Sequence, residues 1–348
     1  MPRAMPSIRV KLLSRFPADV WLHQFPEGKP VWGCCQFLLD RETEDYDWLV
    51  VYDDVPPRSN QGENAYENLA CPPSHTLLVT TEPPTVKVYG RAFTEQFGVV
   101  LTSQPEWALP HPQRIYAQPA LHWIYGLGST KIRSFREIET LNPGCKSRNL
   151  SLVFSPKRMR HTLHKRRHEF MRRLMALLPE MDVFGRGARP LDDKAEALDP
   201  YRYHIAVENY IGPHHWTEKL ADAFLGLALP FYCGCPNASD YFPADSFIPI
   251  DIADPEGAAR VIRHAIVNDE YTRRLPAIIE ARRRVLYEYN LFAVIASQIE
   301  PRHAISQGLR SDSTIYSRHA LRRNSLIVAW QDMCDKVRVR WRSWRMHA

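Results

Sequence analysis

Thirteen residues in the second half of the chain, ENYIGPHHWTEKL at positions 208–220, bring together side chains that can do chemistry. The stretch holds two acids, one lysine and two adjacent histidines. Three kinds of site use such residues: a metal centre, a general acid/base site, and a cradle for a phosphate-bearing ligand. Because His214 and His215 are neighbours, they cannot readily bind one metal ion together in an ordinary helix or strand, which disfavours the metal centre.

The elements on either side of this stretch predict where its side chains lie. Residues 203–207, YHIAV, form an apolar run typical of a short buried strand. Glu208 and Asn209 follow the carboxyl end of that strand, which is where ligands bind in open α/β sheets. Further on, apolar residues recur at the spacing of a helix packed on a sheet: Leu220, Ala223, Phe224 and Leu227.

Thr217 is a suitable N-cap for this helix, and Glu218 and Lys219 then occupy its first turn. The helix dipole does not favour a lysine there. A lysine beside free backbone N–H groups is explained if an anion binds at the same place, because both then direct positive charge at it. The alternative is a solvated lysine on a surface helix, and these thirteen residues alone leave both interpretations open.

The rest of the chain predicts two α/β domains. The chain has 348 residues, which is longer than a single hydrophobic core usually supports. The first part has apolar runs ended by Pro or Gly turns, as in strands buried on both faces of a parallel sheet. A second series of strands begins near Asn149, so the halves are predicted to join near residue 140. No run has the length of a membrane-spanning helix, and the N-terminus lacks a signal-peptide core, so we expect a cytoplasmic protein.

Positive charge is concentrated at the C-terminal end. The net charge is +6, and nine basic residues stand against three acids from Leu309 onward, so the body is neutral. Apolar residues there advance by three and four positions: Ile327, Trp330, Cys334, Val337, Trp341 and Trp344. A tryptophan stripe among arginines indicates a helix on an anionic membrane surface. The predicted membrane contacts are Trp330, Arg338, Trp341, Arg342 and Trp344.

Besides membrane contact, the tail allows three other interpretations. The helix could pack back on the body, or it could form the seam of a homodimer. Nucleic acid is disfavoured as a partner, because no recognition fold accompanies the basic residues. The predicted location is therefore the cytoplasm, with peripheral attachment to the inner face of the membrane.

Around residues 201–220, the region of the opening stretch, the sequence resembles glycosyltransferase family 10, the alpha-1,3/4-fucosyltransferases. The family has a strand of the form Tyr-basic-aromatic-x-x-Ala-Phe-Glu-Asn, then seven residues, then Thr-Glu-Lys; this chain has YRYHIAVEN, YIGPHHW and TEKL. The following ADAFLGLALPFYCGCPNASDYFPADSFIPIDIAD and the upstream SLVFS, RRHEFMRRL and DVFGRG keep the family's order. The resemblance covers about residues 145–290, and several collinear blocks are more specific than one short motif.

The resemblance implies an α/β protein of the GT-B fold, with two Rossmann-like domains facing a central cleft. The expected domains are an acceptor domain at 1–140, a GDP-sugar domain at 141–308 and a basic amphipathic helical tail at 309–348. The implied reaction is a bacterial-type inverting transfer of L-fucose from GDP-fucose to a glycan hydroxyl of GlcNAc or Glc type, on a surface polysaccharide or glycolipid, with no metal and no cofactor. Another GDP-deoxysugar donor and a non-catalytic GDP-sugar-binding or membrane-associated protein are the alternatives.

The resemblance also assigns roles by motif. Lys219 is expected to contact the diphosphate, and Glu218 to hydrogen-bond nucleotide or sugar hydroxyls. Arg167, in RHEF, matches the arginine that approaches the phosphates, with Arg166 as the rival if the register slips by one. His215 stands where the family usually has tyrosine, which leaves the donor sugar open. The full expected donor-binding set is Arg167, Glu208, Asn209, His215, Thr217, Glu218 and Lys219.

An inverting transfer also needs a base for the acceptor hydroxyl. Glu82 ends the apolar run HTLLVTTEPP, in a place similar to that of the family's base, and it is the expected catalytic residue. The alternative is that Glu82 only caps the turn at the two following prolines. Glu95 and Glu106 are the acids that could replace it in the role of base.

Overall fold

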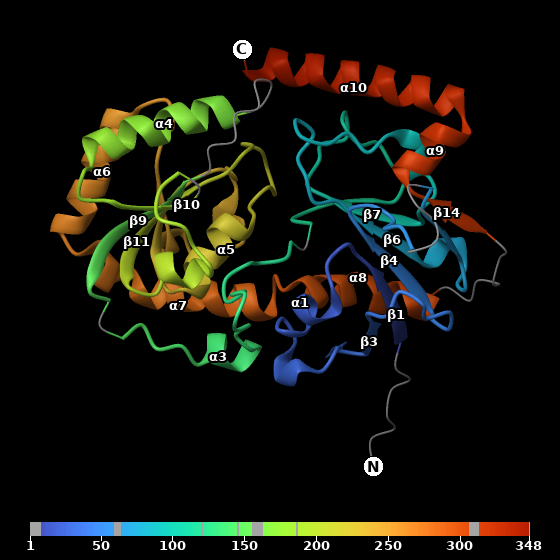
Figure 1. The fold of residues 1–348 in the computed structure, drawn as a ribbon, viewed down its shortest axis with the longest axis horizontal. Helices are drawn as coiled ribbons and strands as arrows, with labels where there is room; N and C mark the ends of the chain where they lie inside the picture. Colours follow the sequence, from blue (N-terminus) through green and yellow to red (C-terminus); the bar gives the residue numbers. More distant parts are fainter. Residues whose placement is uncertain are drawn as a thin grey trace. The chain divides into compact units, whose positions relative to one another are not determined.

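The computed structural model describes residues 8–58, 64–119, 121–144, 146–154, 163–185, 187–305 and 313–347 (Figure 1). The chain divides into two compact units. Unit 1 contains residues 1–120 together with 291–348, and unit 2 contains residues 121–290. Both units are built of parallel strands and helices, which confirms the predicted α/β class.

Unit 1 has a seven-stranded sheet. Its strands lie in the order β2 (Val31–Trp32), β3 (Cys35–Leu38), β1 (Ile8–Leu13), β4 (Trp48–Tyr52), β6 (Thr76–Val79), β7 (Val99–Thr102), β8 (Arg114–Tyr116). All neighbours are parallel except β2 and β3. Every residue of β4 and β6 is buried, as the apolar runs predicted. The chain places β3 on one side of β1 and β4 on the other, so the strand order reverses there.

The other elements of unit 1 are α1 (Ala18–Leu22), η1 (Pro26–Gly28), β5 (Tyr66–Asn68), η2 (Pro73–His75), α2 (Arg91–Thr94), α8 (Leu291–Ile305), β14 (Thr314–Tyr316), α9 (Arg318–Asn324) and α10 (Leu326–His347). Helix α8 lies in unit 1 rather than in the predicted domain at 141–308. The physical reason is its apolar face: Phe292 stacks on Phe25 with ring centroids 3.8 Å apart and is fully buried in the core of the sheet.

Unit 2 has a five-stranded sheet, parallel throughout. Its strands lie in the order β10 (Asp182–Gly185), β9 (Arg148–Phe154), β11 (Tyr201–Val207), β12 (Leu229–Cys233), β13 (Ile248–Pro249). Here the strand order reverses between β9 and β11. The remaining elements are α3 (Phe135–Glu139), α4 (His164–Leu177), η3 (Lys194–Ala197), α5 (Glu218–Leu225), η4 (Ala238–Asp240), η5 (Ala244–Ser246), α6 (Pro255–Val267) and α7 (Glu270–Tyr287).

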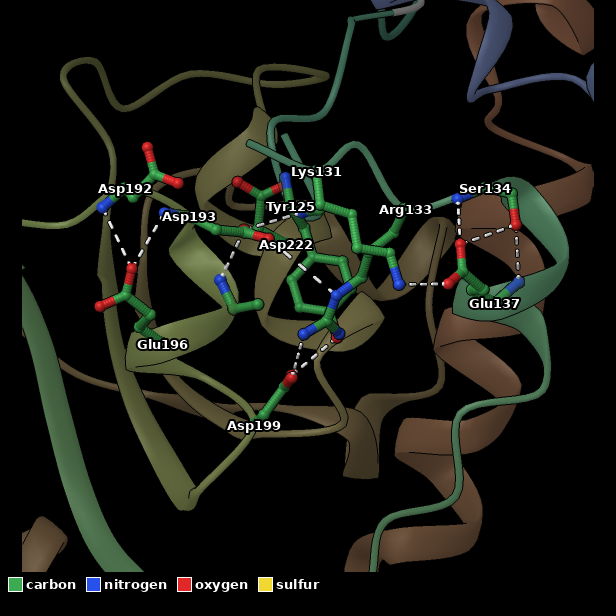
Figure 2. Close-up of polar contacts among 12 residues, drawn as sticks. Tyr125, Lys131, Arg133, Ser134, Glu137, Asp192, Asp193, Glu196, Asp199 and Asp222 are labelled. Atoms are coloured by element: carbon green, nitrogen blue, oxygen red, sulfur yellow. Dashed lines mark hydrogen bonds and ion pairs between the residues drawn. The ribbon is translucent and has the colours of Figure 1, made fainter. Parts of the chain in front are cut away.

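The segment 121–144 belongs to unit 2, so the units meet at residue 120 and not near the predicted 140. Figure 2 shows the polar contacts that fix it there. Asp199 accepts hydrogen bonds from the Tyr125 hydroxyl (2.7 Å) and from the Arg133 guanidinium (2.7 Å). Asp222 accepts one from the Tyr125 backbone N–H at 3.1 Å. These bonds join residues far apart in sequence, which no local pattern reveals.

Helix α10 continues from α9 and is the long red helix of Figure 1. One face packs on unit 1, where Val339 is fully buried beside Val88 and Ala108. Four residues of the predicted stripe lie on the other face: Ile327, Trp330, Val337 and Trp341 are 70%, 63%, 64% and 53% exposed. The side chain of Trp344 lies outside the described residues. Within the part of the chain that the structure describes, no helix is both long enough and apolar enough to span a membrane.

Candidate functional site

Glu208 lies directly beyond β11, at the point where the strand order of unit 2 reverses. Its side chain is buried, and both carboxylate oxygens are used. Oε1 accepts the backbone N–H of Thr217 at 2.8 Å, and Oε2 accepts the Thr217 hydroxyl at 2.7 Å. Burial raises the pKa of the Glu208 carboxyl, although Lys219 opposes the shift. Glu208 therefore ties the loop after β11 to the start of α5.

Thr217 is the N-cap of α5, since its hydroxyl accepts the Lys219 backbone N–H at 3.3 Å. The Lys219 ammonium lies 2.8 Å from Glu218 Oε1, 3.0 Å from the Thr217 hydroxyl and 3.4 Å from Glu208 Oε2. Burial alone would lower the pKa of Lys219, but the two carboxylates outweigh it and raise the pKa. Lys219 is therefore a fixed cation at the carboxyl end of β11, not a solvated lysine.

Arg167 brings a second cation to the same place from α4, which follows β9. Its Nη1 donates a hydrogen bond to Asn209 Oδ1. Its Nε is buried and has no hydrogen-bond partner among the described residues, which leaves a donor for a ligand. Burial lowers the pKa of the guanidinium, and Glu208 opposes that shift. The rival Arg166 is exposed, so the predicted register at Arg167 is the one that reaches Asn209.

The two adjacent histidines contact different tyrosines. His215 is 2% exposed and packs edge-on against Tyr210, with ring centroids 5.3 Å apart. Burial lowers its pKa to about 3, so the ring is neutral near pH 7 and adds no positive charge to the site. His214 has a φ of 61°, and its ring nitrogen lies 2.5 Å from the Tyr241 hydroxyl. Within the described residues, no group of three or more His, Cys, Asp or Glu side chains is arranged to hold a metal ion.

Gly234 is a further residue of this site, and the sequence interpretation did not single it out. It follows β12, the strand beside β11. A Cβ at this position would lie 2.4 Å from the Glu208 Cγ and 2.5 Å from the Tyr232 hydroxyl, so only glycine fits next to the buried carboxylate. A glycine directly after a buried strand was the available signal.

Glu82 lies in unit 1, three residues beyond the end of β6. Its side chain is exposed, and its backbone oxygen accepts a hydrogen bond from Gln104 Nε2 at 2.8 Å. The two other candidate acids are also exposed: Glu95 ends α2, and Glu106 has a side chain that is 81% exposed. Glu82 is three residues beyond the carboxyl end of β6, and Glu106 is four residues beyond that of β7.

Asp53, which the sequence interpretation missed, lies beyond the neighbouring strand β4 with a φ of 78°. It accepts hydrogen bonds from the hydroxyls of Thr81 (2.8 Å) and Tyr89 (2.7 Å), and it pairs with Lys87 at 2.6 Å. Burial acts to raise its pKa, but Lys87 and the hydrogen bonds prevail and the pKa is lowered. This ionised carboxylate fixes Thr81, the residue before Glu82.

Comparison with known proteins adds to this geometry. The family model described as Glycosyltransferase family 10 (fucosyltransferase) C-term matches residues 146–273. Two Homo sapiens proteins, 4-galactosyl-N-acetylglucosaminide 3-alpha-L-fucosyltransferase FUT6 and 3-galactosyl-N-acetylglucosaminide 4-alpha-L-fucosyltransferase FUT3, are each 35% identical over 91 residues. That stretch is 24% of this chain and 25% of each relative, so the match spans about a quarter of the length of these curated relatives.

A solved structure of an alpha1,3-fucosyltransferase with GDP is similar in fold. The TM-score is 0.50 at 14% identity, covering 90% of this chain and 94% of that one. At this identity the likeness concerns the fold alone, and it confirms the predicted GT-B class. The family model covers β9 to the start of α7, the region that carries Arg167, Glu208 and Lys219. Residues 146–273, which carry this site, therefore match the C-terminal part of glycosyltransferase family 10.

Proposed function

We propose that the chain is an inverting glycosyltransferase that moves L-fucose from GDP-fucose to a hydroxyl of a glycan acceptor. The observation that carries the proposal is the charged cluster at the switch point of unit 2. Lys219 is held by two carboxylates, and Arg167 keeps a buried N–H without a partner among the described residues. Two fixed cations beside the start of a helix suit a diphosphate, and they lie within the segment that matches the family.

In this proposal Glu82 takes the proton of the acceptor hydroxyl. The acceptor oxygen attacks the anomeric carbon of fucose while the bond from that carbon to the β-phosphate oxygen of GDP breaks, so the configuration inverts. Lys219 and Arg167 stabilise the charge that gathers on the departing diphosphate. The proposal needs no metal and no cofactor, and its acceptor is a GlcNAc- or Glc-type glycan.

Nucleotide binding tests the donor half of the proposal. A ligand that binds only the folded state raises the Tm, so GDP should raise it and UDP and CDP should not. Lys219→Met should weaken GDP binding by about 10- to 100-fold, because a hydrogen bond to a charged group contributes ~1.5–3 kcal/mol. The matched control is Lys165→Met, which removes an exposed lysine from α4. A Tm that GDP leaves unchanged would contradict the proposal.

Turnover tests the base. Glu82→Gln should lower the rate of fucosyl transfer by about 10²- to 10⁴-fold, the usual contribution of a general base, while GDP still binds. Glu106→Gln removes another exposed carboxylate of unit 1 and should leave the rate unchanged. Full turnover in Glu82→Gln would show that this carboxylate is not the base, whatever the result with GDP.

One residue, His215, supports a second candidate donor, another GDP-deoxysugar. His215 stands where the family usually has tyrosine, and its neutral ring is packed against Tyr210. A transfer assay that compares GDP-fucose with other GDP-sugars identifies the donor. Release of GDP in that assay, dependent on a glycan acceptor, also distinguishes an enzyme from a non-catalytic GDP-sugar-binding protein.

A further inference from the structure

Unit 1 contains an open cavity of about 880 Å³ that is separate from the proposed donor site. Its wall includes Ser14 and Arg15 after β1, residues 54–57 after β4, and the first residues of α9. Strands β1 and β4 are the pair between which the strand order of this sheet reverses. In open α/β sheets, ligands bind beyond the carboxyl ends of strands at such a switch point.

The cavity carries an excess of positive charge. Its described wall contains five cations, Arg15, Arg41, Lys87, Arg318 and Arg322. Lys87 is already paired with Asp53 at 2.6 Å, so the excess charge comes from the four arginines. Asp54 is the carboxylate in the same wall, and its Oδ1 already accepts the backbone N–H groups of Val55 (2.9 Å) and Arg318 (3.1 Å). A concave surface with several fixed charges of one sign attracts a ligand of the opposite sign.

The two arginines from α9 are only weakly compensated by acids. The Arg318 guanidinium donates to backbone carbonyls, through Nε to Tyr89 O at 3.2 Å and through Nη2 to Val88 O at 2.6 Å. Arg322 approaches Asp332 at 3.5 Å, a long contact for an ion pair. Carbonyl oxygens orient a guanidinium without neutralising it, so both arginines keep charge for a ligand.

A shared carboxylate has the same effect on Arg41, another cation of the cavity wall. Glu67 is buried and contacts three cations: Arg41, Lys11 (2.6 Å) and Arg58 (3.4 Å). Arg58 also reaches the exposed Glu42 at 3.1 Å. One buried carboxylate cannot balance three cations, so Arg41 adds positive charge to the cavity.

We propose that this cavity binds a phosphate or diphosphate group. The planar fork of a guanidinium matches phosphate oxygens, and several arginines together suit a multiply charged anion better than a single carboxylate. In the transferase proposed above, the group belongs to the acceptor, as a phosphorylated glycan or a glycan on a lipid diphosphate. That assignment rests on the proposed function, whereas anion binding in the cavity does not.

Inorganic pyrophosphate is the probe, and isothermal titration calorimetry of the full chain is the measurement. Arg15→Gln and Arg322→Gln should each weaken pyrophosphate binding by about tenfold, the scale of one lost charged hydrogen bond. Arg15 is exposed, so this variant keeps the fold even if Arg322→Gln does not. The matched control is Arg91→Gln, an exposed arginine of α2 outside the cavity wall. Titration with and without GDP separates this cavity from the donor site.

Each outcome of these titrations either supports or overturns the proposal. Binding that weakens in both cavity variants and survives in Arg91→Gln supports the proposal, even if GDP does not bind and the proposed function fails. Tighter binding of geranyl diphosphate than of pyrophosphate identifies a lipid-linked source, and equal binding identifies a free or sugar phosphate. Absence of pyrophosphate binding, equal binding in all variants, or tighter binding of glucuronate than of pyrophosphate would overturn it.

Discussion

Two buried histidines make the stability of unit 2 depend on pH. His215 is 2% exposed, and His204 is 7% exposed with its Nδ1 2.8 Å from the Ser151 hydroxyl. Burial lowers the pKa of each ring to about 3. An unfolded histidine binds a proton near pH 6.5, whereas these folded rings stay neutral until about pH 3. The unfolded state therefore binds more protons between these values, and acid favours unfolding.

We predict that the free energy of unfolding is fully retained above about pH 6.5 and falls as the pH is lowered toward 3. Each buried histidine contributes up to about 1.4 kcal/mol per pH unit in that window. Urea denaturation at pH 7, 6 and 5 measures the slope. His215→Phe should reduce this slope by the contribution of one bound proton. His264→Asn, a change at an exposed histidine of α6, should leave the slope unchanged. An unaltered slope in His215→Phe would refute the assignment.

Secondary-structure elements with a local signal were predictable. The apolar run of β11 and the helical spacing of α5 appear in the sequence, and Thr217 caps α5 as its residue type indicates. What the sequence could not reveal depends on non-local packing. The sequence of α8 shows that it has an apolar face but not which sheet that face packs on. Likewise, no residue near Asp53 in the sequence indicates that Thr81 and Lys87 will contact it.

The connector into unit 2 allows a matched test of such non-local contacts. Arg133 bonds Asp199 and the Tyr125 hydroxyl, and its side chain is 26% exposed (Figure 2). Lys131, on the same segment, pairs with Glu137, but both side chains are largely exposed. Arg133→Ala should lower the free energy of unfolding by about 1–3 kcal/mol, because it leaves half-buried partners unsatisfied. Lys131→Ala should cost less than about 1 kcal/mol. Equal losses in urea denaturation would contradict this difference.

At the scale of the molecule, both ends of the chain build unit 1. Strand β14 pairs antiparallel with β5, and the Ser317 backbone N–H donates to Ala65 O at 2.8 Å. The Arg318 N–H then reaches Asp54. The C-terminal segment is therefore part of the unit 1 fold, so truncation before α9 would damage unit 1 as well as remove the basic tail. The role of α10 has to be tested by substitutions on its exposed face.

That face carries the proposed membrane contact. Trp330 and Trp341 are 63% and 53% exposed, so Trp330→Glu and Trp341→Glu should leave the free energy of unfolding within about 0.5 kcal/mol of the wild type. The double variant should no longer sediment with vesicles that contain phosphatidylserine, because the helix loses apolar area and gains charge that anionic lipid repels. Val339→Asp, on the buried face, should instead destabilise unit 1. Unchanged sedimentation of the double variant would contradict the membrane assignment. If the wild type is a dimer and the tryptophan substitutions dissociate it, the stripe is a homodimer seam instead.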